Sequence, residues 1–450
     1  MGERVRQWLS SLIHSPPTIN THLEHYRRGA TPRRLCVFPA REARLNHVNL
    51  RRFAQKNVST FKRMFAQRTN WNLESNRLSS ALATHRASGK PLLDLTISNP
   101  TEGGFQYDEQ AIRDALSNPA VLRYEPNPKG IASARAAVTQ YCAEHGAAVS
   151  LEDIFLTTST SEAYSFAFRL LCDPGDEILA PCPSYPLFDF LADIHDVKLI
   201  HYPLRYDRGW QIDFQAIERI VTTRTRGIIV VHPNNPTGHY VKVAEMKELS
   251  AICAARELAL IADEVFLDFS LTEEPLASFA ANAGALTFTL SGISKISGLP
   301  QMKASWLIVN GPERWKAEAV ARLEVIADTY LSINAPVQLA LPAFMAQRTA
   351  FQEQLMARVR KNLAELDRQL ATQQACSRLK IEGGWYAILR GSRLRDEEEF
   401  AIELLRQKGV YVHPGHFYDF SEPGRLVLPL ITPERDFAGG VSLLLAKANQ

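Results

Sequence analysis

The chain has 450 residues, 46% of them hydrophobic and 22% charged, which is enough to bury a large core across roughly two or three domains. It contains no apolar stretch long enough for a transmembrane helix, so we expect no membrane-spanning segment. The six cysteines show no Cys-x-x-Cys spacing, which is typical of buried thiols in a reducing compartment and predicts a cytoplasmic location.

The formal net charge of +3 is unevenly distributed along the chain. Residues 1–68 hold 14 basic and 3 acidic residues, a net charge of +11, whereas the remainder has a net charge of −8. An Arg-rich, acid-poor leader is compatible with a nucleic-acid arm or a transit peptide, and it lacks the apolar region of a secretory signal. We predict a disordered extension, or an upstream start with the true start at Met64, and we expect no nucleic-acid partner.

Beyond the leader, strand and helix patterns alternate as they do in a mostly parallel sheet covered by helices. The expected elements are helices at 75–86 and 131–145 and strands at 91–96, 154–157, 177–180, 226–231, 258–262, 286–290 and 306–309. A long helical stretch from Pro312 to Met345 should link this region to a C-terminal α+β part.

A hydroxyl-rich segment separates the strand at 154–157 from a helical run at 164–171. The segment contains Ser159, Thr160 and Ser161. A helix N-terminus presents free N–H groups and a positive dipole to an anion, and the hydroxyls add further donors. This arrangement favours an anion site, although a helix cap without any ligand would show the same pattern.

Lys295 directly follows the apolar strand at 286–290 and is flanked by small residues. Desolvation at such a position disfavours the charged form of the amine and makes it a nucleophile. Schiff-base formation with a carbonyl cofactor uses such an amine, and pyridoxal phosphate is the usual cofactor of this kind. Most lysines near strand ends lie at the surface, so Lys295 needs support from elsewhere in the chain.

That support comes from polar residues at the ends of two other predicted strands. Asn235 lies in the turn sequence Asn-Asn-Pro-Thr-Gly after the strand at 226–231, and Asp263 follows the strand at 258–262. The C-terminal ends of parallel strands gather on one edge of a sheet, where ligands bind. A carboxylate aimed at a pyridine nitrogen keeps it protonated, and an amide could hydrogen-bond the ring hydroxyl.

The motifs in this chain are Asn235-Pro236-Thr237-Gly238, then Asp263, then Ser294-Lys295, and then Gly298-Leu299-Pro300. Their order resembles that of the class I/II aminotransferases of the fold-type-I pyridoxal-phosphate enzymes. The likeness runs from about residue 70 to the C-terminus. It extends to four further segments: 124–130, 173–177, 409–415 and 424–426.

The resemblance implies a mostly parallel, seven-stranded-type sheet in a large domain, plus a smaller α+β domain. The expected boundaries are 69–115 and 351–450 for the two parts of the small domain and 116–350 for the large, cofactor-binding domain. It also implies a homodimer with a shared active site, in which Tyr124 reaches the phosphate of the neighbouring subunit.

The remaining roles are likewise carried over from the resemblance. Ser159, Thr160 and Ser161 would cradle the phosphate, and Tyr185 would stack on the pyridine ring. Arg425 would grip the α-carboxylate of the substrate, and a guanidinium fork suits a carboxylate. Asn99 and its loop would lie over the substrate. No metal is implied.

Two positions depart from the family pattern. Lys303 stands where relatives carry an arginine for the phosphate, so a cation remains but the fork is lost. Phe266 stands where many relatives have a tyrosine that bonds the ring hydroxyl, so a donor to the ring oxygen is lost. Both changes could weaken cofactor binding, and neither removes the core chemistry.

The resemblance implies an enzyme that exchanges an amino group between an amino acid and a 2-keto acid through a Lys295 Schiff base. A carbon–sulfur β-lyase on the same fold is an alternative, because a fold does not fix a reaction. A non-catalytic, aminotransferase-like regulatory module is a second alternative, which the complete catalytic set argues against. The sequence shows no motif that fixes the side-chain preference.

Overall fold

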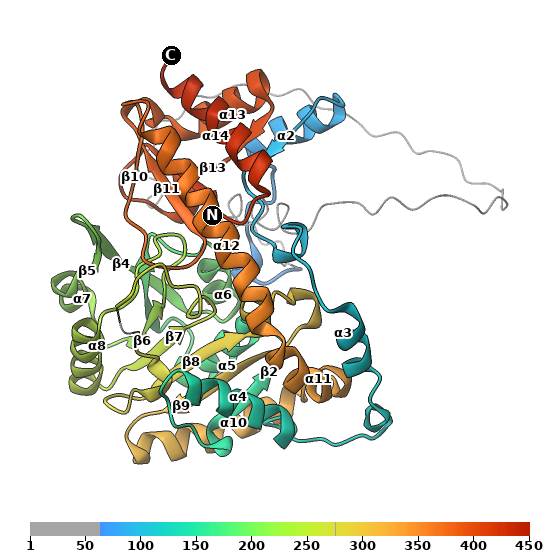
Figure 1. The fold of residues 1–450 in the computed structure, drawn as a ribbon. Coiled ribbons are helices and arrows are strands. Elements are labelled where there is room, and N and C mark those ends of the chain that lie inside the picture. The colour runs from blue at the N-terminus through green and yellow to red at the C-terminus, as the bar shows by residue number, and fades with distance from the viewer. Residues whose placement is uncertain (1–63, 275) are drawn as a thin grey trace.

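The computed structural model describes residues 64–450 except residue 275, and it has an α/β architecture with a large mixed sheet and a smaller antiparallel one (Figure 1). Residues 1–63 of the expected leader lie outside the described residues. Within the described part, Arg68 pairs with Asp196 at 2.5 Å. None of the helices in this part of the chain has the length and apolar character needed to cross a membrane.

Within residues 64–450 the large sheet has eight strands. In spatial order they are β2 (Ile154–Thr157), β9 (Ser305–Asn310), β8 (Thr287–Gly292), β7 (Ala259–Asp263), β6 (Thr225–Val231), β3 (Glu177–Cys182), β4 (Lys198–Tyr206) and β5 (Trp210–Ile212). Strands β8, β7, β6, β3 and β4 run parallel, while β9 is antiparallel to both β2 and β8, and β5 is antiparallel to β4. This arrangement confirms the predicted fold class, with β5 as a short addition at one edge.

The large sheet is buried on both faces, as a mostly parallel sheet must be. In β6, Ile229 and Val231 pack into one core cluster, whereas Ile228 and Val230 pack into another. This alternation follows from the two-residue period of a strand. The continuous apolar run therefore predicts a doubly covered strand rather than a half-exposed one.

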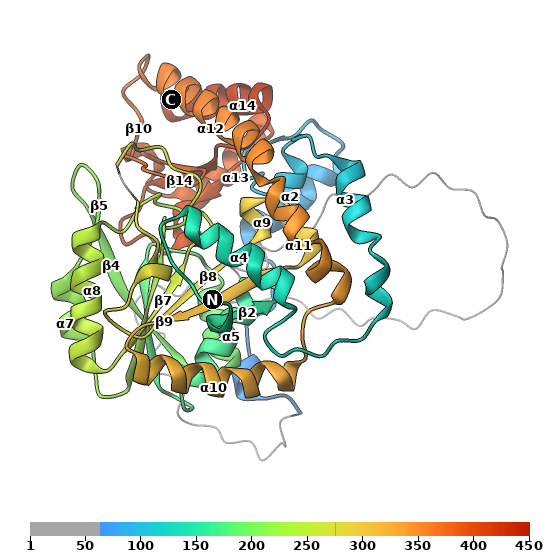
Figure 2. The ribbon, with the colours of Figure 1, turned by 60° about the horizontal axis from the view of Figure 1, so that its bottom comes forward.

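Some of the helices cover the two faces of the large sheet, and others pack with the smaller sheet. The helices of the described residues are α2 Arg77–Ala87, α3 Glu109–Leu116, α4 Ala132–Glu144, α5 Thr160–Leu171, α6 Phe188–Ile194, α7 Phe214–Ile220, α8 Val243–Arg256, α9 Ile293–Ile296, α10 Glu313–Tyr330, α11 Ala335–Ala346, α12 Arg348–Leu370, α13 Glu397–Lys408 and α14 Glu434–Ala448. Helices α5, α6 and α10 pack on one face, and α7 and α8 pack on the other. Figure 2 shows α7 and α8 at one side of the sheet and α10 along its bottom.

The smaller antiparallel sheet consists of β10 (Ser377–Arg378), β11 (Tyr386–Arg390), β14 (Arg425–Pro429) and β13 (His413–Pro414). The chain segment before the large sheet contacts the segment after it, because β1 (Leu93–Asp94) pairs in parallel with β12 (Val410–Tyr411). Helix α12 runs from this region toward α11 (Figure 1).

Most of the expected elements lie where the sequence places them, but one expectation is wrong. The stretch from Pro312 to Met345 is divided into α10 and α11 rather than forming one helix. Leu331 has a positive φ of 67°, a conformation outside the helical region, and Asn334 then caps α11 by accepting the N–H of Val337. The strand expected at 91–96 is also shorter, spanning only β1.

Candidate active site

In the described structure, five of the residues singled out in the sequence line one cavity: Thr160, Tyr185, Asn235, Asp263 and Lys295. The remaining lining residues are apolar or small, or carry hydroxyl groups: Phe188, Val231, Val265, Phe266, Gly292, Ser294, Ser305 and Tyr386. The cavity lies where β6, β7 and β8 end. Parallel strands bring their C-terminal ends to one edge, which explains how residues distant in sequence share it.

Lys295 enters the cavity from α9, directly after β8. Its Nζ lies 5.7 Å from the centre of the Phe266 ring and 5.3 Å from that of the Trp385 ring. Burial lowers the pKa of Lys295 to about 8, although the attraction of the Asp263 carboxylate raises it in part. More of this amine is therefore uncharged near neutral pH than in a solvent-exposed lysine.

Asp263 is the last residue of β7 and is 8% exposed. One of its carboxylate oxygens accepts the hydroxyl of Tyr164 at 3.1 Å, and the other accepts the backbone N–H of Val265 at 3.1 Å. Burial raises the pKa of Asp263 to about 6, while these hydrogen bonds and Lys295 lower it. The carboxyl is therefore mostly ionised at neutral pH, although it is buried.

Asn235 lies in the turn after β6 and is 6% exposed. Its amide oxygen Oδ1 has no hydrogen-bond partner among the described residues. A buried polar atom without a partner costs about 1–3 kcal/mol, so such atoms usually have a reason. Because Asn235 lines the cavity, this amide is available to a ligand bound there.

The N-terminus of α5 meets the same cavity through Thr160. Ser159 caps the helix by accepting the backbone N–H of Glu162 at 3.1 Å. The carboxylate of Glu162 accepts the backbone N–H of Thr158 at 2.6 Å. Thr160 therefore offers its hydroxyl at a helix N-terminus, where the dipole favours an anion. Ser159 and Ser161 are partly buried and do not line the cavity.

Four other residues singled out in the sequence do not line this cavity. Lys303 is exposed and adopts a positive φ of 55°. Tyr124 is 79% exposed in the single chain. Asn99 caps a short 3-10 helix by accepting the backbone N–H of Thr101 at 3.2 Å.

Arg425 is the fourth of these residues, and its guanidinium is engaged elsewhere. It lies at the start of β14 and forms an ion pair with Glu422 at 2.5 Å. Within β14 it lies opposite Arg390, whereas Pro429 at the far end of the strand lies opposite Tyr386. Tyr386 lines the cavity, whereas Arg425 does not. The assignment of Arg425 to the substrate carboxylate therefore stays a prediction.

Several residues of the site were missed by sequence reasoning. Tyr386 reaches the cavity from the smaller sheet, Tyr164 holds Asp263 from helix α5, and Ser305 lines the cavity from β9. The Gly383-Gly384-Trp385-Tyr386 sequence was a usable signal, because paired glycines before an aromatic strand indicate a close approach of the backbone. Tyr164 had no such signal, since its alignment with Asp263 depends on helix packing.

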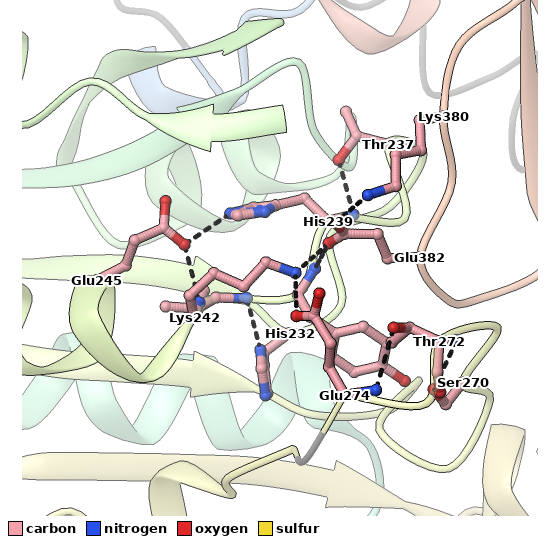
Figure 3. A network of polar contacts seen from close by, with 12 residues as sticks. His232, Thr237, His239, Lys242, Glu245, Ser270, Thr272, Glu274, Lys380 and Glu382 are labelled. Carbon is pink, nitrogen blue, oxygen red and sulfur yellow. Dashed lines mark hydrogen bonds and ion pairs between the residues drawn. The ribbon is translucent and has the colours of Figure 1, made fainter. Parts of the chain in front are cut away.

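A polar network joins the Asn235 turn to the segment that precedes Tyr386 (Figure 3). Glu382 accepts Lys242 Nζ at 2.7 Å and the backbone N–H of Tyr240 at 3.3 Å. Gly238 has a positive φ of 69°, and a Cβ on it would lie 2.6 Å from the carbonyl oxygen of Gly383, so both the conformation and the close approach favour glycine here.

The same network contains two buried histidines (Figure 3). His232 Nδ1 accepts the backbone N–H of Val241 at 3.0 Å, and His239 Nε2 lies 3.1 Å from a carboxylate oxygen of Glu245. Burial lowers the pKa of His232 to about 3 and that of His239 to about 4, so both are neutral at physiological pH. The network therefore fixes the turn without carrying histidine charge.

Comparison with known proteins agrees with this geometry. The family "Aminotransferase class I and II" matches residues 90–436. An alanine aminotransferase of Mycobacterium tuberculosis is 28% identical over 371 residues, covering 80% of this chain and 86% of the relative. A glutamate-pyruvate aminotransferase, AlaA, of Escherichia coli is 27% identical over 346 residues, covering 74% of this chain and 85% of the relative.

Solved structures share the fold. An aminotransferase from Escherichia coli superposes with a TM-score of 0.73 at 25% identity, covering 82% of this chain and 94% of that one. An alanine aminotransferase from Pyrococcus furiosus superposes with a TM-score of 0.76 at 22% identity, covering 83% and 96%. With most of its length matched in sequence and in fold, the chain belongs to the class I and II aminotransferase family and is an aminotransferase.

Proposed function

We propose that the cavity binds pyridoxal phosphate and that the chain uses it to exchange an amino group between an amino acid and a 2-keto acid. The observation that carries this proposal is that Lys295 and Asp263 line the same cavity. The two groups approach from adjacent parallel strands, β8 and β7. An amine of lowered pKa and a buried carboxylate are the groups that this chemistry requires.

The residues present fit this cofactor. The amide oxygen of Asn235 is buried without a partner among the described residues, so a ligand hydroxyl that donates to it would relieve an unfavourable burial. Thr160 at the N-terminus of α5 suits a phosphate, with Ser159 and Ser161 beside it. Tyr185 offers a flat ring within the lining. We therefore assign Lys295, Asp263, Asn235, Tyr185 and the start of α5 to cofactor binding.

Lys295 would attack the carbonyl of the cofactor and later carry a proton. Its pKa of about 8 lets the amine exist in both protonation states near neutral pH, which suits a group that must first accept and then donate a proton. The aromatic rings of Phe266 and Trp385 lie beside its Nζ, at 5.7 Å and 5.3 Å between the nitrogen and the ring centres. Bound pyridoxal phosphate supplies an aldehyde and an electron-withdrawing ring.

Asp263 would hold a proton on the pyridine nitrogen. Its carboxylate is fixed by Tyr164 and Val265, so it needs no reorientation when charge develops in the ring. A preorganised charge in a buried site acts more strongly than it would in water.

Amino acids and keto acids are the proposed substrates, with Arg425 holding the carboxylate and Asn99 near the entrance. The names of the relatives make alanine, glutamate and their keto acids the first pairs to test. Tyr124 and Leu122 are 79% and 92% exposed, which supports the proposal that this loop contacts a second copy in a homodimer. Lys303, which is exposed and does not line the cavity, is proposed to contact the phosphate from its solvent side.

We also propose that residues 116–350 form the large domain and that 69–115 and 351–450 form the small one. The pairing of β1 with β12 supports this division, because it joins the two outer parts. A cytoplasmic location is proposed from the thiols of Cys142, Cys172, Cys253 and Cys376, which form no disulfide among the described residues.

The test is a panel of amino-acid donors and keto-acid acceptors with purified, cofactor-loaded protein. We expect a yellow protein that transfers amino groups, and we expect Lys295→Ala to abolish transfer. Lys198→Ala, which removes an exposed lysine on β4, is the matched control. Unchanged turnover in Lys295→Ala would end the assignment.

Pyruvate and sulfide are measured alongside. Release of pyruvate from cystine or cystathionine, with no donor–acceptor pair active, would establish the β-lyase alternative. A protein that binds no cofactor would support the regulatory alternative. The family match and the named relatives favour neither.

A further inference from the structure

We propose that Tyr386 supplies the hydroxyl that Phe266 lacks, by donating a hydrogen bond to the ring oxygen of the bound cofactor beside Asn235. This inference rests on the proposed function, because it concerns a cofactor bound in the Lys295 cavity. Tyr386 would then be a cofactor-contacting residue that comes from the smaller sheet rather than from the large one.

Phe266 has no polar atom to offer, although it lines the cavity. It is 3% exposed, and its ring packs edge-on against Trp385 at 4.7 Å between ring centres. Its ring also lies 6.2 Å from the Tyr386 ring at an interplanar angle of 79°. Tyr386 is therefore a phenol beside the position where a hydroxyl is missing.

The surroundings of Tyr386 indicate a hydroxyl with a defined place. Tyr386 is 5% exposed and lines the cavity. Burial raises its pKa, while hydrogen bonding with Ser98 and Asn235 lowers it, so the phenol stays protonated and lies next to the Asn235 amide. That amide has an unpartnered oxygen, which marks this corner of the cavity as incomplete without a ligand.

The assignment of the ring oxygen to this corner follows from the covalent structure of the cofactor. A pyridine nitrogen and the aldehyde carbon lie opposite each other, which matches Asp263 and Lys295. The phosphate arm and the ring hydroxyl lie on either side of the aldehyde carbon. If the arm points to Thr160 at the start of α5, the hydroxyl faces the other polar groups of the lining, Asn235 and Tyr386.

The fold fixes the position of Tyr386 relative to Asn235. Tyr386 pairs with Pro429 in the smaller sheet, which fixes its height along β11. Glu382, just before it in the chain, accepts hydrogen bonds from Lys242 and Tyr240, which follow the Asn235 turn (Figure 3). Tyr386 and Asn235 therefore approach the cavity from different parts of the fold but are tied together by a polar network.

A phenol at this place has a measurable effect on the cofactor. Hydrogen-bond donors stabilise the ionised ring oxygen and so weaken its hold on the neighbouring proton of the chromophore. Removing the Tyr386 hydroxyl should make the chromophore keep that proton to higher pH. The pKa read from the visible absorption of the bound cofactor should rise by about one unit in Tyr386→Phe, a tenfold change in proton affinity.

The experiment titrates the visible spectrum of cofactor-loaded protein without substrate. It compares wild type, Tyr386→Phe, Phe266→Tyr and the double variant. Phe266→Tyr restores a hydroxyl on the neighbouring ring, so it should lower the spectral pKa and reverse most of the rise when combined with Tyr386→Phe. Tyr202→Phe is the matched control, because it removes a buried phenol that donates to the Ile229 carbonyl at 2.8 Å outside the cavity.

The possible outcomes distinguish failure of the inference from failure of the proposed function. A wild-type protein without a visible cofactor band refutes the proposed function itself. A normal band whose pKa is the same in wild type and Tyr386→Phe overturns the inference. A raised KM for amino acids with an unmoved spectral pKa also overturns it and assigns the phenol to the substrate. If Tyr386→Phe fails to fold, an unmoved spectral pKa in Tyr386→Leu, which also lacks the hydroxyl, overturns the inference instead.

Discussion

Replacing Asp263 by asparagine should damage turnover far more than replacing Lys303 by alanine. Asp263 is buried at the end of β7 and lines the Lys295 cavity, whereas Lys303 is exposed and does not line it. Asparagine keeps the size of the side chain and can still accept the Val265 N–H. The substitution therefore removes the charge while leaving the cavity filled.

The magnitude follows from what the charge does. Asp263 would hold the ring nitrogen protonated while negative charge develops in the ring, so its interaction strengthens in the transition state. A hydrogen bond to a charged group contributes about 1.5–3 kcal/mol, which corresponds to a roughly 10- to 150-fold loss of turnover. An exposed lysine contact contributes only about 0–1 kcal/mol, so Lys303→Ala should stay within about fivefold of wild type.

The assay is turnover of each variant at saturating pyridoxal phosphate, with circular dichroism as a check on folding. Lys303→Ala should need more cofactor for half-maximal activity and then recover. Lys303→Arg should bind the cofactor at least as well as wild type if the fork reaches the phosphate. A dead Lys303→Ala at saturating cofactor, together with an active Asp263→Asn, would show that the two roles are wrongly assigned.

The pH dependence of cofactor capture should follow Lys295, whose pKa is lowered to about 8. The rate at which cofactor-free protein acquires visible absorption should rise about tenfold per pH unit below 8 and level off above it, because only the uncharged amine attacks; a flat profile would contradict this. A chain that begins at Met64 should keep its fold and activity, since Arg68 and its ion pair with Asp196 remain. An insoluble shortened chain would count against this, and so would a full-length chain that binds nucleic acid when the shortened chain does not. Arg425→Ala should raise the KM of every amino-acid substrate at least about tenfold, whereas Glu422→Ala should not; a lowered melting temperature with an unchanged KM would make Arg425 structural.

The sequence predicted the large sheet well, because its signals are local. The strand β2 was expected at its observed bounds, and β6, β7 and β8 each end within a few residues of the predicted positions. Asn235, Asp263 and Lys295 each follow one of these apolar runs. The rule that parallel strand ends share an edge was therefore enough to bring them together before any side-chain geometry was known.

The failures have a different physical origin. The break between α10 and α11 depends on a positive φ at Leu331, and leucine carries no signal for that conformation. Tyr386 was missed because it reaches the cavity from another sheet, across a packing contact that no local period encodes. The place of the Arg425 guanidinium was equally hidden, because an ion pair depends on the orientation of two side chains.

The Arg425–Glu422 pair does not by itself oppose the proposed role of Arg425. The Glu422 side chain is 76% exposed, whereas that of Arg425 is only 14% exposed. An ion pair to a solvated carboxylate contributes about 0–1 kcal/mol, because water competes for both charges. A bidentate contact to a substrate carboxylate in a site that excludes water is stronger, so exchange of one carboxylate for the other is favourable. The exchange also requires the guanidinium to reach the cavity, because Arg425 does not line it. A KM that rises in Arg425→Ala and stays unchanged in Glu422→Ala would therefore show that the guanidinium contacts the substrate and that its pair with Glu422 is not needed for this.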